Sequence, residues 1–239
     1  LAIYEPEMLR WIFASQRPGS EFQISFDLDV IKLYEDFDRA RRLAHEAEDG
    51  SKADKKRRIT RRTFELSSVA AARIEPGSPV PFVPGFRGLS VILQAYDGDV
   101  DRSLARYEAM GDISSDEERR FFRQRAECCW RWIEEYAPED FRYRMRTQAV
   151  TRPLTPDQRT VLQRLVEALN NQPDISEANL IPHMQSLCDE TDLSLKTFCP
   201  VAYDLLIGRE QGPKLTTLLT TIGGERAVPL LALSLRPDR

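Results

Sequence analysis

Apolar residues recur every three or four positions over most of the chain, which is the spacing that puts them on one face of an α-helix. The clearest stripe follows Thr155 and Pro156, a helix N-cap with proline just inside the helix. Its members are Val161, Leu162, Leu165, Val166 and Leu169. Similar patterns predict helices near residues 6–16, 29–45, 88–96, 99–110, 115–136, 176–189, 200–207, 214–222 and 225–235.

Two short stretches alternate apolar and polar residues instead, which is typical of a strand. The first is residues 22–26, FQISF, and the second surrounds Phe64 and Leu66. Between them lies a basic cluster at residues 55–58, KKRR, which we expect in a loop. The sequence therefore predicts a small α+β segment ahead of an otherwise all-α chain.

Proline and glycine divide the chain. Residues 75–88 hold four prolines together with glycines, too many for a helix, so we expect a semi-rigid boundary there. We predict three regions, 1–75, 76–150 and 151–239. Beyond the boundary, Ser115 and Glu118 have the spacing of a capping box at the start of a long helix. Helix lengths are irregular, which argues against a repeat solenoid.

Composition narrows the function classes. The net charge is −4, and we find no continuous apolar run of the ~20 residues that a membrane span needs.

Cys128 and Cys129 are neighbours, a pair typical of free thiols in a reducing compartment. A zinc site from His183, Cys188 and Cys199 is conceivable, but buried free thiols are the favoured interpretation because no CxxC spacing is present. The chain begins with Leu1 rather than Met, so we expect a piece of a longer protein.

One segment departs from the acidic average. Residues 119–152 contain nine arginines, seven aromatic residues and five carboxylates. Guanidinium groups beside aromatic rings suit single-stranded RNA, which offers phosphates and unstacked bases. A long amphipathic helix with a salt-bridged outer face would show the same composition. Both interpretations stand at this point.

Signatures of catalysis are missing from the sequence. It contains no phosphate-binding GxxxxGK[ST], no GxGxxG after a strand, no HExxH and no GxSxG. With two histidines and scattered acids, no general acid–base group is evident. We therefore expect that this chain catalyses no reaction by itself.

Three stretches resemble known families. Residues 4–40 resemble class I lysyl-tRNA synthetases just after their KMSKS loop, where a PE-x-LRY helix leads to an R-x-P turn and an fD-x-D segment. Here these are Pro6 to Trp11, a compact Arg17-Pro18, and Phe26 to Asp29. Residues 123–145, ending in WIEEYAPEDFRYRM, fit the same family. Residues 205–227, LLIGREQGPKLTTLLTTIGGERA, are similar to the end of the related glutamyl-tRNA synthetases.

This resemblance implies a full-length enzyme that joins lysine to its tRNA with ATP and Mg²⁺. The family's HIGH and KMSKS signatures are absent here, so the chain should be inactive alone and need no cofactor of its own. It implies the end of a stem-contact fold followed by an anticodon-binding α-helix cage of two helical subdomains. The implied partner is tRNA(Lys) in the cytoplasm, with no DNA or membrane; protein partners are left open.

The resemblance also implies particular RNA contacts. In the glutamyl relatives an arginine of the long helix reaches an anticodon base, and Arg125 takes the matching place. The turn into the penultimate helix and one position of the helix before it face the same loop. We add Arg144 as a backbone contact, so the expected tRNA-binding residues are Arg125, Arg144, Tyr203, Gly212, Pro213, Lys214 and Leu215.

A different class of function fits the composition too. A non-catalytic helical scaffold could use the arginine and aromatic segment as a protein-binding hot spot. Salt separates the two hypotheses, because binding to several phosphates weakens log-linearly with salt and an apolar protein interface does not.

Overall fold

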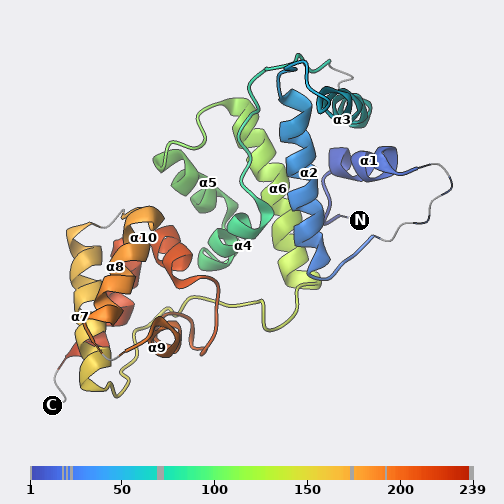
Figure 1. Cartoon of the computed structure of the whole chain (residues 1–239). Helices are drawn as coiled ribbons and strands as arrows, with labels where there is room; N and C mark the ends of the chain where they lie inside the picture. Colours follow the sequence, from blue (N-terminus) through green and yellow to red (C-terminus); the bar gives the residue numbers. More distant parts are fainter. Residues whose placement is uncertain are drawn as a thin grey trace. The chain divides into compact units, whose positions relative to one another are not determined.

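The computed structural model describes residues 2–17, 19, 21, 24–68, 73–172, 175–191 and 193–236. Over these residues the chain forms ten α-helices and one short 3-10 helix (Figure 1). They are α1 (Pro6–Ser15), α2 (Asp29–His45), α3 (Asp54–Ser67), α4 (Phe86–Ala95), α5 (Val100–Ala109), α6 (Asp116–Glu135), α7 (Pro156–Asn171), α8 (Glu177–Asp189), α9 (Leu195–Ile207), α10 (Leu215–Ala232) and η1 (Leu233–Leu235). The all-α prediction is confirmed.

The small α+β segment is not confirmed. Phe22 and Gln23 of the first expected strand lie outside the described residues, and residues 24–26 are irregular. The second expected strand is wrong, because Phe64 and Leu66 belong to helix α3. Phe64 is buried while Leu66 is 60% exposed, so the two side chains point to opposite sides, as residues two apart in a helix do. The basic cluster at residues 55–58 is likewise the first turns of α3 and not a loop.

The helices form two compact units. Unit 1 comprises Leu1–Ser90 and Val100–Glu139, and unit 2 comprises Val91–Asp99 and Asp140–Arg239. Helix α4 therefore begins in unit 1 and ends in unit 2. This division follows spatial contacts; the three regions expected from the sequence stay a prediction.

Unit 1 has an aromatic core. The ring of Phe86 stacks on Tyr34 with centroids 4.2 Å apart and meets Trp132 edge-on at 5.5 Å. Phe37 of α2 stacks on Phe64 of α3 at 5.1 Å. Burying such rings provides most of the stabilisation of a small domain.

At the start of α6 the capping box is present, since Glu118 N–H donates to Ser115 Oγ at 3.2 Å and Ser115 N–H donates to Glu118 Oε2 at 3.0 Å.

Unit 2 packs α7, α8 and α9 around α10 (Figure 1). The stripe predicted on α7 is buried throughout. Residues 91–99 also belong to this unit, because Tyr143 N–H donates to Gln94 Oε1 at 2.7 Å and Tyr143 Oη–H donates to the Val91 carbonyl at 2.8 Å. Among the described residues, Leu215–Leu235 alone is long and apolar enough for a membrane span by length and composition. Its packing on α7 and α9 and its kink at Gly223 suit a core helix.

Candidate nucleic-acid interface

Arg125 lies inside unit 1. Its side chain is 0% exposed, its Nε donates to Glu5 Oε1 at 2.6 Å, and its Nη1 donates to Asp38 Oδ2 at 2.8 Å and to the Pro84 carbonyl at 3.1 Å. Burial by itself would lower the pKa of Arg125, but Glu5 and Asp38 together raise it above its ordinary value. This side chain ties α6 to the segment before α1, to α2 and to the proline-rich stretch, and it presents no surface to RNA.

The position of Arg125 in the helix explains this burial. Phe122, Ala126, Cys129 and Ile133 form the buried stripe of α6, and Arg125 falls within it. The same periodicity in the sequence is the signal that could have placed Arg125 in the core. Its expected base contact therefore gains no support from its surroundings.

The other arginines of residues 119–152 are mostly paired. Arg119 bonds Glu108 and Asp116, and Arg123 bonds Asp101. Arg146 and Arg152 share the carboxylate of Asp204. The salt-bridged interpretation thus describes much of this segment, which is moreover divided between the two units at Glu139 and Asp140.

A tight turn in unit 2 holds four of the expected residues, Gly212, Pro213, Lys214 and Leu215. We call residues 208–215 the α9–α10 turn. It begins at Gly208, whose left-handed backbone (φ 71°) caps α9 and requires glycine. Tyr203 is only 8% exposed, and its hydroxyl donates to the Pro213 carbonyl. The buried Tyr203 side chain thus holds the turn through a hydrogen bond from the core side.

Gly212 is exposed at the outer side of this turn. A Cβ atom at this position would lie 2.8 Å from Ile207 Cδ1, closer than real Cβ contacts, and 3.0 Å from Tyr203 Cδ1, which is tighter than most. A side chain here would therefore force the Ile207 methyl group and the Tyr203 ring to shift. Gly212 has no side chain, so its exposure means that backbone atoms are at the surface here.

The first turn of α10 follows directly. Its amides have no acceptor within the helix and carry the positive end of the helix dipole. Leu215 is buried, while Lys214 is 62% exposed and lies 3.2 Å from Glu177 Oε1. The same Glu177 oxygen accepts from the hydroxyls of Thr216 and Thr217 at 2.9 and 2.7 Å.

Sequence reasoning misses Glu177. Burial raises the pKa of its carboxyl group, but hydrogen bonds from Thr217, Thr216 and Lys214 outweigh that effect and lower it. The carboxylate therefore stays ionised and anchors the start of α8 to the start of α10. Nothing in local sequence predicts a contact between residues 39 positions apart.

Arg144 is a weakly held cation in the same unit. Its side chain is 81% exposed and its Nε lies 3.4 Å from Asp97 Oδ1, itself largely exposed. Two residues later, Arg146 N–H donates to the Leu206 carbonyl at 2.7 Å and its Nε to the Asp204 carbonyl at 2.8 Å. These bonds attach the Arg144 segment to the last turn of α9, next to the α9–α10 turn.

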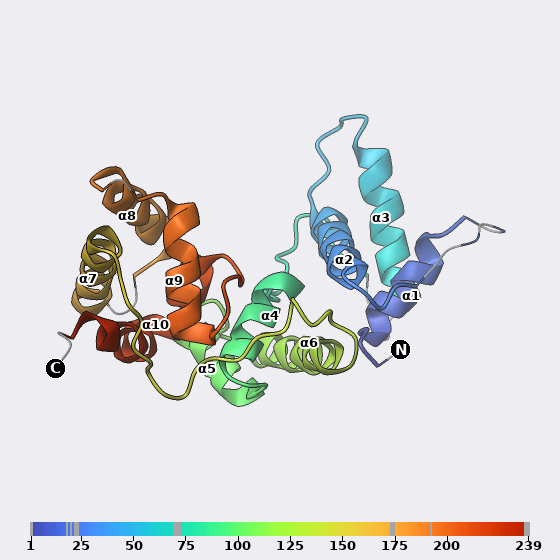
Figure 2. The same cartoon turned by 90° about the horizontal axis from the view of Figure 1, so that it is seen from below.

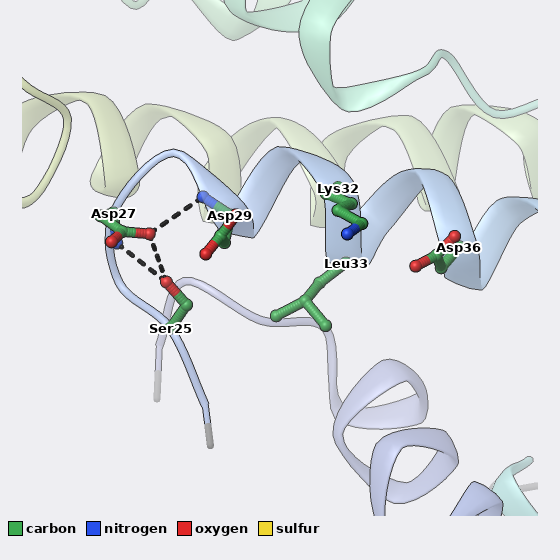
Figure 3. Close-up of a pocket in the computed structure, with 6 residues that line it drawn as sticks. All are labelled: Ser25, Asp27, Asp29, Lys32, Leu33 and Asp36. Atoms are coloured by element: carbon green, nitrogen blue, oxygen red, sulfur yellow. Dashed lines mark hydrogen bonds between the residues drawn. The ribbon is translucent and has the colours of Figure 1, made fainter. Parts of the chain in front are cut away.

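Unit 1 carries an acidic depression of about 410 Å³ at the start of α2 (Figure 3). Asp27 Oδ1 accepts from the Asp29 N–H at 2.9 Å and from the hydroxyl of Ser25. The Ser25 hydrogen bond and then the Asp29 amide lower the pKa of Asp27, so this surface stays anionic and repels phosphate. Within the described part of the chain, no three His, Cys, Asp or Glu side chains are grouped to hold a metal ion.

Two family models match this chain. Residues 1–70 match "tRNA synthetases class I (K)", and residues 130–229 match "Anticodon binding domain". The second match contains α9, the α9–α10 turn and most of α10.

Curated relatives match nearly the whole chain. The lysine–tRNA ligase of Treponema pallidum is 34% identical over 98% of this chain and 43% of its own length. Those of Borrelia garinii and Pyrococcus horikoshii are 33% and 26% identical over 95% and 97% of the chain.

The chain belongs to the class I lysyl-tRNA synthetase family. It spans about two fifths of the length of the family members it matches, 43% and 42% for the first two. The segment matched to the anticodon-binding domain lies mainly in unit 2 and includes the surface formed by Lys214 and Gly212.

Proposed function

We propose that this chain is the tRNA-binding C-terminal part of a cytoplasmic lysine–tRNA ligase. In this proposal unit 2 reads the anticodon of tRNA(Lys). Support comes from the family match over residues 130–229 and from the α9–α10 turn inside it, whose backbone is exposed at Gly212 and held by Tyr203. This turn is the observation that carries the proposal.

The chemistry of the turn suits an unpaired base. Uridine presents carbonyl oxygens that accept hydrogen bonds and one N–H that donates. Lys214 and the first amides of α10 supply donors, and the Glu177 carboxylate supplies an acceptor beside them. Arg144 adds a cation for the phosphate backbone. Arg125, fully buried, is left out of this set.

The whole enzyme would attach lysine to tRNA with ATP and Mg²⁺. The residues present here do not fit those groups, because the HIGH and KMSKS signatures are absent from the sequence and no metal-binding cluster forms among the described residues. We therefore assign no step of that chemistry to this chain.

Binding assays with altered RNA test the proposal. The chain should bind tRNA(Lys) and its isolated anticodon stem-loop, and each substituted anticodon base that is read should cost about 1–3 kcal/mol. Equal affinity for tRNAs of every anticodon would refute recognition by unit 2. Binding that resists salt would instead favour the protein scaffold.

A further inference from the structure

Helix α3 has one face fixed to the rest of unit 1. Arg61 Nε donates to the Ala44 carbonyl at 2.7 Å and its Nη2 to the Glu46 carbonyl at 2.8 Å. Arg57 pairs with Glu46 and Asp49 at 3.0 Å each and with Asp54 at 2.7 Å. With Phe64 packed on α2, these contacts hold α3 beside α2 (Figure 2).

The opposite face of α3 is exposed, and it carries cations around two exposed apolar side chains, Ile59 and Leu66. The helix contains six Lys and Arg residues against two acids, whereas the whole chain is acidic. Arg58 and Arg62 on this side are paired with Glu48 and Glu65. Lys55 and Lys56 of α3, and Lys52 just before the helix, are exposed, and no carboxylate in the described part of the chain pairs with them. We call these three residues the lysine face.

The position of the lysines is unfavourable for the helix itself. Lys55 and Lys56 lie in the first turn of α3, where the helix dipole disfavours positive charge. The neighbouring Asp54 carboxylate, which suits that place, is turned back to accept from the Gly50 N–H at 2.8 Å and to bind Arg57. Lys55 and Lys56 therefore do not stabilise α3 through its dipole, and both ammonium groups remain available to an anionic ligand.

We propose that the lysine face binds phosphates of the tRNA backbone. Lysine ammonium groups contact phosphate as point charges, which position a nucleic acid without reading its sequence. Lys55 and Lys56 lie in a formed helix, so little backbone conformational entropy is lost on binding. The inference rests on the proposed function only in taking the same tRNA as the ligand.

A charge-matched pair of variants tests this inference. Lys55→Gln with Lys56→Gln removes two positive charges and keeps helix-forming residues. Lys32→Gln with Lys196→Gln removes two charges from exposed lysines elsewhere. Affinity of the chain for tRNA(Lys) and for its anticodon stem-loop would be measured over a range of salt, with circular dichroism to check folding.

The lysine-face variant should bind tRNA(Lys) about two- to thirtyfold more weakly, the weakening expected for two exposed ion pairs. The slope of log affinity against log salt should fall by about 0.7–0.9 for each phosphate that the variant no longer binds. The control variant should keep the wild-type slope. Weaker binding of tRNA alone would place the phosphates outside the anticodon arm, and weaker binding of both RNAs would place them within it.

Equal affinities and slopes for both variants would overturn the inference and show a solvated helix face. Loss of binding to anionic phosphatidylserine vesicles with unchanged tRNA binding would also overturn it, in favour of a membrane surface. Failure of the wild-type chain to bind the stem-loop would refute the anticodon proposal instead, so the two failures are distinguishable.

Discussion

Replacing Arg125 by methionine removes the cation at the centre of unit 1. The variant leaves the carboxylates of Glu5 and Asp38, which are only 11% and 10% exposed, without their common partner. Breaking a buried ion pair from one side costs about 3–5 kcal/mol. Since domains are stable by only about 5–15 kcal/mol, we expect unit 1 to come close to unfolding.

Urea denaturation monitored by tryptophan fluorescence measures this destabilisation, because Trp132 lies in the same core. Arg123→Met is the matched control two positions earlier on α6. Its guanidinium pairs with Asp101 at the surface, with both side chains about half or more exposed, and should contribute at most about 1 kcal/mol.

A rescue experiment sharpens the test. Adding Glu5→Gln and Asp38→Asn to Arg125→Met removes the stranded charges and should recover part of the stability. Stability within about 1 kcal/mol of wild type for Arg125→Met, together with weaker discrimination at one anticodon base, would refute the structural role. It would restore Arg125 as a base-reading residue.

Three further changes address the α9–α10 turn. Gly212→Ala should lower the stability of unit 2 by about 1–3 kcal/mol through overpacking and weaken stem-loop binding. An unchanged unfolding midpoint and an unchanged affinity would show that the neighbouring side chains accommodate the added methyl group without cost. Tyr203→Phe removes one hydroxyl donor to Pro213 and should cost about 0.5–1.5 kcal/mol in thermal unfolding, and an unchanged midpoint would mean that this bond is dispensable. Glu177 has a pKa below its ordinary 4.5, so its contribution is full above that value and disappears as pH falls through the lowered pKa. Unfolding midpoints between pH 3 and 7 should therefore fall more steeply in wild type than in Glu177→Gln, and parallel curves would contradict the anchoring role.

Local signals in the sequence predict most of the helices. The capping box at Ser115, the N-cap at Thr155 and the stop at Gly208 are decided by neighbouring residues, so sequence suffices to find them. Helix α3 differs from its prediction because two alternating apolar residues resemble a strand, although the six Lys and Arg residues around them favour a helix.

The candidate site is less predictable because tertiary contacts decide it. Sequence reasoning expects Tyr203 and Gly212 at an RNA surface, and the structure shows that the tyrosine is buried and bonds to the turn while the glycine is exposed. Arg125 depends on Glu5 and Asp38, which are 120 and 87 positions away. Glu177 shows the same dependence. No local pattern contains such pairs.

The shared helix α4 bears on how this protein can be cut or recombined. A peptide made only of residues 140–239 would lack Val91 and Gln94, the acceptors of Tyr143, and would also lack Tyr96, whose ring lies 4.7 Å from the guanidinium carbon of Arg226. A chimera that exchanges the anticodon-recognition half between related ligases should therefore carry residues 86–99 along with the C-terminal helices. A junction after Glu139 does not meet that requirement. A junction before α4 meets it, but it also moves α6 and so requires that Arg125 find its partners Glu5 and Asp38 in the other protein.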